Sequence, residues 1–181
     1  IGGVVGQNES EKTVQYNVNC AYVKRYIWVS GYEENSASRN NRGTDKYYVG
    51  GVIGEQQNRT SGGWVIDSCV NYGAVEDENS HNSGGIIARW RNNGGTVSNC
   101  FNYGVLYTNM QAASQGTVGG IIGFINEMTN GQDVNILSCQ NHGIVNQPIY
   151  YSTTAANNYC ANDCAGILAE VNTQGVTETV K

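Results

Sequence analysis

The stretch that decides the fold is Gly84-Gly85-Ile86-Ile87-Ala88, followed within the same unit by Cys100-Phe101-Asn102-Tyr103-Gly104. Its first half recurs with small changes at residues 50–54 and 119–123, and its second half at residues 69–73 and 139–143. The three central copies start at positions 50, 84 and 119, which are 34 and 35 residues apart. A fixed period of this size indicates one small unit stacked on copies of itself, so the sequence predicts a solenoid.

Each unit contains three short apolar runs, which Gly- and Asn-rich turns separate. Ile and Val dominate these runs, and both residues favour strands over helices. Three strands per unit, each pairing in parallel with its equivalent one coil away, predict an all-β, right-handed parallel β-helix of about four to five coils. We expect a single domain over residues 1–181, with repeats at 1–49, 50–83, 84–118, 119–163 and a partial copy at 164–181. Two long insertions, residues 21–49 and 144–163, are predicted to leave one edge of the stack.

Equivalent positions in successive repeats predict columns of stacked side chains. Two columns are apolar and should fill the core: Ile66 with Val97 and Ile136, and Val75 with Leu106 and Val145. A third column contains the thiols of Cys69, Cys100 and Cys139, where a cysteine acts as a small apolar residue, and we expect Cys20 to join it.

Asn and Gly columns accompany the thiols. Asn71, Asn102 and Asn141 are predicted at corners between strands, because Asn tolerates the left-handed backbone and its amide can hydrogen-bond along the stack. Gly73, Gly104 and Gly143 then occupy the next tight position. We interpret these columns as structural rather than catalytic or metal-binding.

The adjacent isoleucines do not fit a simple strand. Ile86 and Ile87 are neighbours, as are Ile121 and Ile122, and neighbours on a strand point to opposite faces. One residue of each pair should therefore face outward. The outward stripe is either covered by the chain's long insertions or forms a contact surface for a second copy or a partner.

The phrase Gly-Gly-Ile-Ile-Gly, with a following Ile/Val-x-x-Cys-x-Asn-x-Gly-x-Val, resembles the GLUG-type repeats of large secreted and surface-anchored microbial proteins, including adhesin-like proteins. The resemblance covers essentially the whole chain, although only three central copies are complete. The first copy departs from it, because residues 20–24 carry neither the Asn nor the Gly. The resemblance implies a β-solenoid that serves as an extracellular stalk or scaffold.

Six cysteines leave the redox state open. The ladder thiols are either reduced or paired between coils, for example Cys20 with Cys69 and Cys100 with Cys139. Cys160 and Cys164 are close enough in the chain to form a local disulfide in an oxidising compartment. A zinc site on this second pair is the weaker alternative, because no further ligand pair completes it.

Two N-glycosylation sequons begin at Asn8 and Asn58, just after two of the Gly-Gly runs. In a secreting organism that glycosylates asparagine, both could carry glycans along one edge of the rod. The alternative is that such short motifs arise by chance in an Asn-rich chain.

Composition excludes several classes of partner. The 181 residues include 15 acidic and 10 basic side chains, for a net charge of −5, so no basic face for nucleic acid is expected. No apolar run is long enough to span a membrane, and no signal peptide is recognisable. The chain opens at a repeat boundary, which predicts a processed product or an excised piece of something longer.

Catalytic groups do not assemble in the sequence, and no cofactor is implied. Residues 76–78 form an acidic run that we interpret as a solvated turn or a weak calcium site, and neither histidine has triad partners. The aromatic residues of both insertions favour binding over catalysis, and the candidate binding residues are Tyr26, Trp28, Tyr32, Tyr150 and Tyr151. These rings could stack on sugars or grip a protein surface, or they could cover the outward isoleucines.

We therefore predict a non-enzymatic extracellular structural protein, the body of a cell-surface fibre, adhesin or self-assembling filament. Its partners would be flanking repeats of a longer chain or further copies associating end to end, because a β-helix ends in unpaired strand edges. The alternative function is a module that binds glycans or a host or surface protein through residues 21–49 and 144–163. A β-helical carbohydrate-active enzyme is the third hypothesis.

Overall fold

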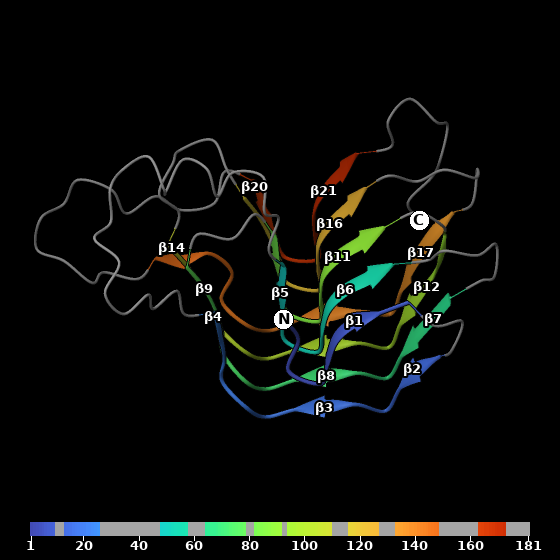
Figure 1. Ribbon diagram of the computed structural model, residues 1–181, viewed down its shortest axis with the longest axis horizontal. Helices are drawn as coiled ribbons and strands as arrows, with labels where there is room; N and C mark the ends of the chain where they lie inside the picture. Colours follow the sequence, from blue (N-terminus) through green and yellow to red (C-terminus); the bar gives the residue numbers. More distant parts are fainter. Residues whose placement is uncertain are drawn as a thin grey trace, which may run out of the picture.

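The structure is a computed structural model that describes residues 1–9, 13–25, 48–57, 64–78, 82–91, 94–109, 116–126, 133–148 and 163–172. Within these residues every regular element is a β-strand, and the strands form five parallel sheets. Each strand pairs with the strand five places later in the chain, so successive coils stack in register (Figure 1). The predicted all-β parallel β-helix is confirmed.

The five sheets are numbered by the order in which one coil passes through them. The first sheet contains β1 (Val5–Asn8), β6 (Ile53–Gln57), β11 (Ile87–Arg91), β16 (Ile122–Asn126) and β21 (Leu168–Asn172). The second contains β2 (Val14–Gln15), β7 (Trp64–Asp67), β12 (Gly95–Ser98) and β17 (Val134–Leu137). The third contains β3 (Val18–Asn19), β8 (Val70–Asn71), β13 (Phe101–Asn102) and β18 (Gln140–Asn141). The fourth contains β4 (Val23–Arg25), β9 (Val75–Glu78), β14 (Leu106–Asn109) and β19 (Gln147–Pro148). The fifth contains β5 (Tyr48–Gly50), β10 (Asn82–Gly84), β15 (Thr117–Gly119) and β20 (Asp163–Ala165).

A full coil thus has five short strands, and the predicted three was wrong. Sharp corners split the runs that the sequence suggested. Between β12 and β13, for example, Asn99 has a φ of 51°, a left-handed conformation that ends one strand before the next begins. The apolar columns are nevertheless as predicted, because Val97 pairs in register with Ile66 on one side and with Ile136 on the other.

The interior holds two separate apolar cores. In Figure 1 the fifth sheet lies in the middle, with the fourth sheet on one side and the first sheet on the other. The larger core contains the thiols and the tryptophans Trp64 and Trp90, and the smaller core contains Val49, Val75 and Leu106. Val145 packs against the smaller core, which confirms the second predicted apolar column.

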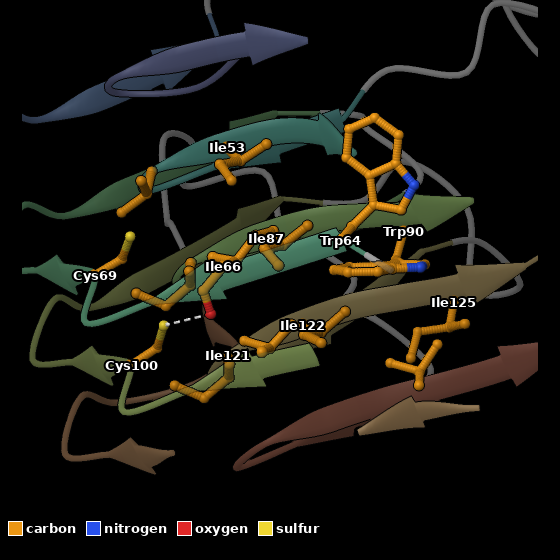
Figure 2. Close-up of a cluster of buried hydrophobic side chains, with 14 residues drawn as sticks. Ile53, Trp64, Ile66, Cys69, Ile87, Trp90, Cys100, Ile121, Ile122 and Ile125 are labelled. Carbon is orange, nitrogen blue, oxygen red and sulfur yellow. Dashed lines mark hydrogen bonds between the residues drawn. The ribbon is translucent and has the colours of Figure 1, made fainter. Parts of the chain in front are cut away.

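The adjacent isoleucines both point inward, so the predicted outward stripe was wrong. Ile86 and Ile87 are each 0% exposed and belong to the larger core. Their amide groups both donate to the carbonyl oxygen of Ile121, at 3.1 and 2.9 Å, so the chain bends here and the alternation of a flat strand does not hold. Figure 2 shows the equivalent pair, Ile121 and Ile122, side by side within this core.

The Gly-Gly pair makes this corner possible. A Cβ on Gly84 would lie 1.9 Å from the carbonyl oxygen of Ile87. A Cβ on Gly85 would lie 2.1 Å from the carbonyl oxygen of Gly120 and 2.4 Å from Cγ of Asn102. The corner between the fifth and first sheets therefore packs directly on the third sheet, and the two halves of the repeated phrase meet in space.

Both long insertions leave the same edge of the stack. One runs from β4 to β5 and the other from β19 to β20, so each connects the fourth sheet to the fifth. This part of the fold prediction is confirmed.

Candidate functional site

A column of buried asparagine amides runs through the described coils. The Nδ2 of Asn19 donates to Oδ1 of Asn71, that of Asn71 to Asn102, and that of Asn102 to Asn141, each over 2.8 Å. Each Nδ2 also donates to the carbonyl oxygen two residues further along its own coil. We call this column, with the corner glycines packed on it, the Asn–Gly seam. It separates the two cores and joins each coil to the next.

The asparagines do not occupy left-handed corners, and that prediction was wrong. The left-handed residues of this turn are Tyr16, Ser68, Asn99 and Ser138, which lie two residues before the third-sheet strands. The seam asparagines belong to the strands themselves. Their role comes from the side-chain amide, which carries both a donor and an acceptor and can therefore repeat along the stack.

Cys20 does not join the thiol column, which corrects a second prediction. Val18 pairs with Val70 and Asn19 pairs with Asn71, so Asn17 stands in the position of Cys69. Cys20 is exposed. The first copy therefore does carry the seam asparagine, three residues earlier than the cysteine alignment suggested. Its equivalent of Gly73 is Ala21, whose carbonyl oxygen accepts from Asn19 as that of Gly73 accepts from Asn71. A disulfide from Cys20 to Cys69 has no place in this register.

Figure 2 shows Cys69 and Cys100 at the inner side of the turn, in successive coils, and Cys139 packs against the same core. Cys69 and Cys100 are buried, Cys139 is half-buried, and all three are free. A hydrogen bond with the central Cys100 thiol lowers the pKa of Cys69 and of Cys139 to about 7 each. The contacts with Cys139 and Cys69 raise the pKa of Cys100. The thiols thus interact with one another along the stack.

The second cysteine pair is only half described. Cys164 is exposed and free, and Cys160 lies outside the described residues. The local disulfide stays a prediction.

An exposed ladder of rings lies on the outside of the same turn. Tyr72 stacks on Tyr103 with ring centroids 5.1 Å apart and planes 12° apart, and Tyr103 stacks on His142 at 4.9 Å and 8°. The ring faces cover one another, so the ladder presents mainly ring edges to solvent. Sugar rings stack on aromatic faces, and this ladder offers them few.

A polar junction between the first and fifth sheets was missed by the sequence reasoning. The guanidinium of Arg89 lies 4.7 Å above the ring of Tyr48 and donates to its hydroxyl group, and its Nη1 lies 3.2 Å from Oε1 of Glu55. Arg89 is only 3% exposed. Asp163 and Glu170 meet at the same junction, where burial and then the Asp163 charge raise the pKa of Glu170. The sequence signal was the pair of opposite charges at the third position of equivalent strands, Glu55 in β6 and Arg89 in β11.

Several acidic side chains accept hydrogen bonds from neighbouring residues or form ion pairs with them. Asp67 accepts hydrogen bonds from Ser98 at 2.6 Å, from Asn99 at 2.9 Å and from Ser68 at 2.9 Å, and these donors lower its pKa. Glu76 and Asp77 were predicted to lie in a solvated turn, but they belong to β9 and are 3% and 0% exposed.

Their partners come from flanking elements. Nζ of Lys24, one coil away, is 2.7 Å from Oε1 of Glu76, and the hydroxyl of Ser83 donates to Asp77 over 2.5 Å. The carboxylates that the sequence reasoning placed in solvent therefore belong to the packed stack.

Several predicted binding residues lie outside the described residues, namely Tyr26, Trp28, Tyr32, Tyr150, Tyr151 and the sequon residue Asn58. The other sequon residue, Asn8, is 8% exposed, and its Nδ2 donates to Oε1 of Gln56 over 2.9 Å. A glycan attached there would displace this hydrogen bond. Asn8 pairs in register with Gln56 rather than with Asn58, so the two sequons are not equivalent positions.

In the described part of the chain, no three His, Cys, Asp or Glu side chains are placed to hold a metal ion. No helix suited to crossing a membrane occurs among the described residues. Almost every unusual polar group identified above is partnered by a residue of an adjacent coil or sheet, and the arrangement can hold coils together. No family model, no curated protein and no solved structure matches the chain.

Proposed function

We propose that this chain is a non-enzymatic structural module of an extracellular protein, forming the body of a cell-surface fibre or adhesin. The observation that carries the proposal is the Asn–Gly seam. Asn71 and Asn102 are 0% exposed, and their amide groups are used in hydrogen bonds along the stack. Buried polar groups whose hydrogen bonds are satisfied in this way specify one arrangement of the coils and make the stack rigid, as a structural module requires.

The other polar groups support the same function. Arg89 is engaged by Glu55 and Tyr48, and the carboxylate of Asp67 by three donors from its own and the next coil. A catalytic site needs groups that remain available to a substrate. The resemblance of the repeated phrase to GLUG-type repeats agrees with a stalk or scaffold outside the cell.

Immunogold electron microscopy of intact, unpermeabilised cells that produce the protein tests this function. Antibodies against the folded chain should label the outer surface, at a distance from the membrane that grows with the number of repeats. Labelling confined to the cell interior would overturn the proposal. Permeabilised cells provide the control for access of the antibody.

Recognition through the two long insertions is the second candidate, which is favoured by their common origin between the fourth and fifth sheets. Segments that leave one edge can form one binding surface. A glycan array should then show binding that is lost in Trp28→Ala and Tyr151→Ala but kept in Tyr72→Ala, which alters only the exposed ring ladder. Release of reducing or unsaturated sugars from polysaccharides would instead favour an enzyme.

A further inference from the structure

The two ends of the stack differ at positions where inner coils admit only glycine. After each third-sheet strand, the Cβ position of glycine points at the preceding coil. For Gly73, Gly104 and Gly143, this position lies 1.9, 1.9 and 2.0 Å from the carbonyl oxygen of that coil. Real Cβ atoms essentially never approach an atom below 3.0 Å, so no side chain fits there. The first coil carries Ala21 at this position.

A second glycine column points the opposite way, at the following coil. The Cβ positions of Gly51, Gly85 and Gly120 lie 2.1, 2.1 and 2.0 Å from the carbonyl oxygen of the next corner, and each also meets the asparagine amide of its own coil. The last member of this column is Gly166. A Cβ on Gly166 would meet nothing within 4 Å, and its φ is not in the left-handed region. Nothing among the described residues requires glycine at this position.

The hydrogen bonds of the seam also run in one direction, from each coil to the following coil. Asn19, Asn71 and Asn102 each donate one N–H to the following coil and one to their own coil. Asn141 donates to the carbonyl oxygen of Gly143 in its own coil, and no described residue accepts its second N–H. The C-terminal edge therefore presents a donor with the position and direction of the inner seam bonds.

We propose that the C-terminal edge of this stack receives one further coil of the same repeat type, and that Ala21 closes the N-terminal edge to such a coil. The incoming coil supplies an asparagine that accepts from Asn141 and packs on Gly166. It also supplies a glycine beside the carbonyl oxygen of Gly143. This polarity holds whether the module serves as a stalk or as a binding surface.

A second copy of this chain does not meet these requirements at its own first coil. Stacked head to tail in register, its Ala21 would take the position that glycine occupies in the inner coils. The Cβ position of Gly143 lies 2.0 Å from the carbonyl oxygen of Gly104. The methyl group of Ala21 would lie about as close to the carbonyl oxygen of Gly143. The occupant is therefore a coil of this repeat type that carries glycine where the first coil carries Ala21.

Extended proteins test the proposal through their melting temperatures. Arg91 pairs with Asn126, and Asn126 with Asn172, so a copy of residues 92–126 placed after Asn172 continues the stack in register. Ser83 pairs with Val49, and Gly2 with Gly50, so a copy of residues 49–82 placed before Ile1 would precede it in register. The references are the chain ending at Asn172 and the full chain, respectively.

The C-terminal extension should raise the melting temperature by roughly 5 °C or more, since each added repeat contributes a new interface. The N-terminal extension should give no rise with Ala21 and a comparable rise with Ala21→Gly. Gly166→Ala should leave the unextended chain unchanged and abolish the gain from the C-terminal extension.

Three results would overturn the proposal. One is a stabilising N-terminal extension on a chain that retains Ala21. Another is a C-terminal gain that survives Gly166→Ala. The third is a C-terminal extension that leaves the melting temperature at the reference value while hydrogen exchange shows the added coil unprotected.

Discussion

Two ladders pass through the same turn, one on each side of the chain, and they differ in what they tolerate. The Asn–Gly seam keeps asparagine in four successive coils, at Asn19, Asn71, Asn102 and Asn141. The ring ladder begins one residue later, yet it carries tyrosine twice and then His142. Both repeat at the spacing of parallel strands, so geometry alone does not account for the difference.

Burial accounts for it. Asn102 is 0% exposed, whereas Tyr103 beside it is 43% exposed. An amide removed from water must keep its hydrogen bonds, and only a side chain with both donor and acceptor can do so in every coil. A ring at the surface requires only another planar ring to stack on, and the imidazole of His142 stacks as well as the phenol ring of a tyrosine does. Stacking thus constrains sequence strongly in the interior and weakly outside.

The largest effect is expected where the seam meets the corner. Gly85→Ala would place a Cβ 2.1 Å from the carbonyl oxygen of Gly120 and 2.4 Å from Cγ of Asn102. Both obstacles are buried in the stack, so the coils must separate locally. We expect a loss of more than about 4 kcal/mol in the free energy of unfolding, measured by urea denaturation followed by circular dichroism.

Gly6→Ala is the matched control, because a Cβ on Gly6 in β1 meets nothing within 4 Å. Its effect should stay within about 0.5 kcal/mol. Equal losses in the two variants would show that the effect is a general one of replacing glycine and that the seam is not specially constrained.

The next effect concerns the amides. Asn102→Ala removes the acceptor for Nδ2 of Asn71 and the donor to Oδ1 of Asn141, which leaves two polar groups of the column without these partners. Each unsatisfied buried group costs about 1–3 kcal/mol, so a total loss of about 3 kcal/mol is expected. Thermal and urea unfolding would measure it.

Asn19→Ala, at the end of the column, removes only one inter-coil bond. It should cost roughly half as much as Asn102→Ala, given about 1–3 kcal/mol per unsatisfied group. Equal losses for Asn19→Ala and Asn102→Ala would show that the number of inter-coil amide bonds does not set the loss in stability.

The difference between buried and exposed columns also explains which features could be predicted from the sequence. The solenoid, the apolar columns and the edge of the insertions followed from period and composition, because stacking in register repeats residue types. Cys20 was predicted in the thiol column because the other copies carry cysteine there, but the first coil has Asn17 at that position. Asn19 would have given the correct register of the first coil, because every coil of the seam needs the donor and acceptor of an asparagine amide.

Contacts between different sheets could not be read from a linear repeat. The inward turn of both Ile86 and Ile87 depends on a corner at which two amide groups share the carbonyl oxygen of Ile121. The buried contact of Arg89 with Tyr48 depends on the first and fifth sheets, which meet only after folding. The predicted aromatic binding residues and Asn58 lie outside the described residues, so their roles stay predictions.

A smaller effect is expected in the ring ladder. Tyr103→Ala removes stacking on both Tyr72 and His142, and aromatic pairs contribute about 0.5–1.5 kcal/mol each at most. Because the ring is partly in water, we expect a total loss near 1 kcal/mol by urea denaturation. Tyr103→His should retain most of the stability, as His142 does in the next coil. A loss as large as that of Asn102→Ala would contradict the proposed difference between inner and outer ladders.

The smallest effect is electrostatic and concerns the exposed side of the turn. Three donors hold the pKa of Asp67 below its ordinary value of 3.8. A carboxyl whose folded pKa is depressed stabilises the fold above its unfolded pKa and loses that contribution as pH falls through the folded pKa. The melting temperature of the parent protein should therefore fall below about pH 4, and Asp67→Asn should fall less over the same range.

Glu170 provides a control of opposite sign. Burial and the Asp163 charge raise its pKa above the ordinary 4.5, so protonation favours the folded state and its penalty appears as pH rises. Glu170→Gln should raise the melting temperature slightly at neutral pH and leave it unchanged in acid. If both variants raised the melting temperature at pH 7, the net charge of −5 rather than these local contacts would govern the pH dependence. The donors around Asp67 would then contribute nothing measurable to the outer side of the turn.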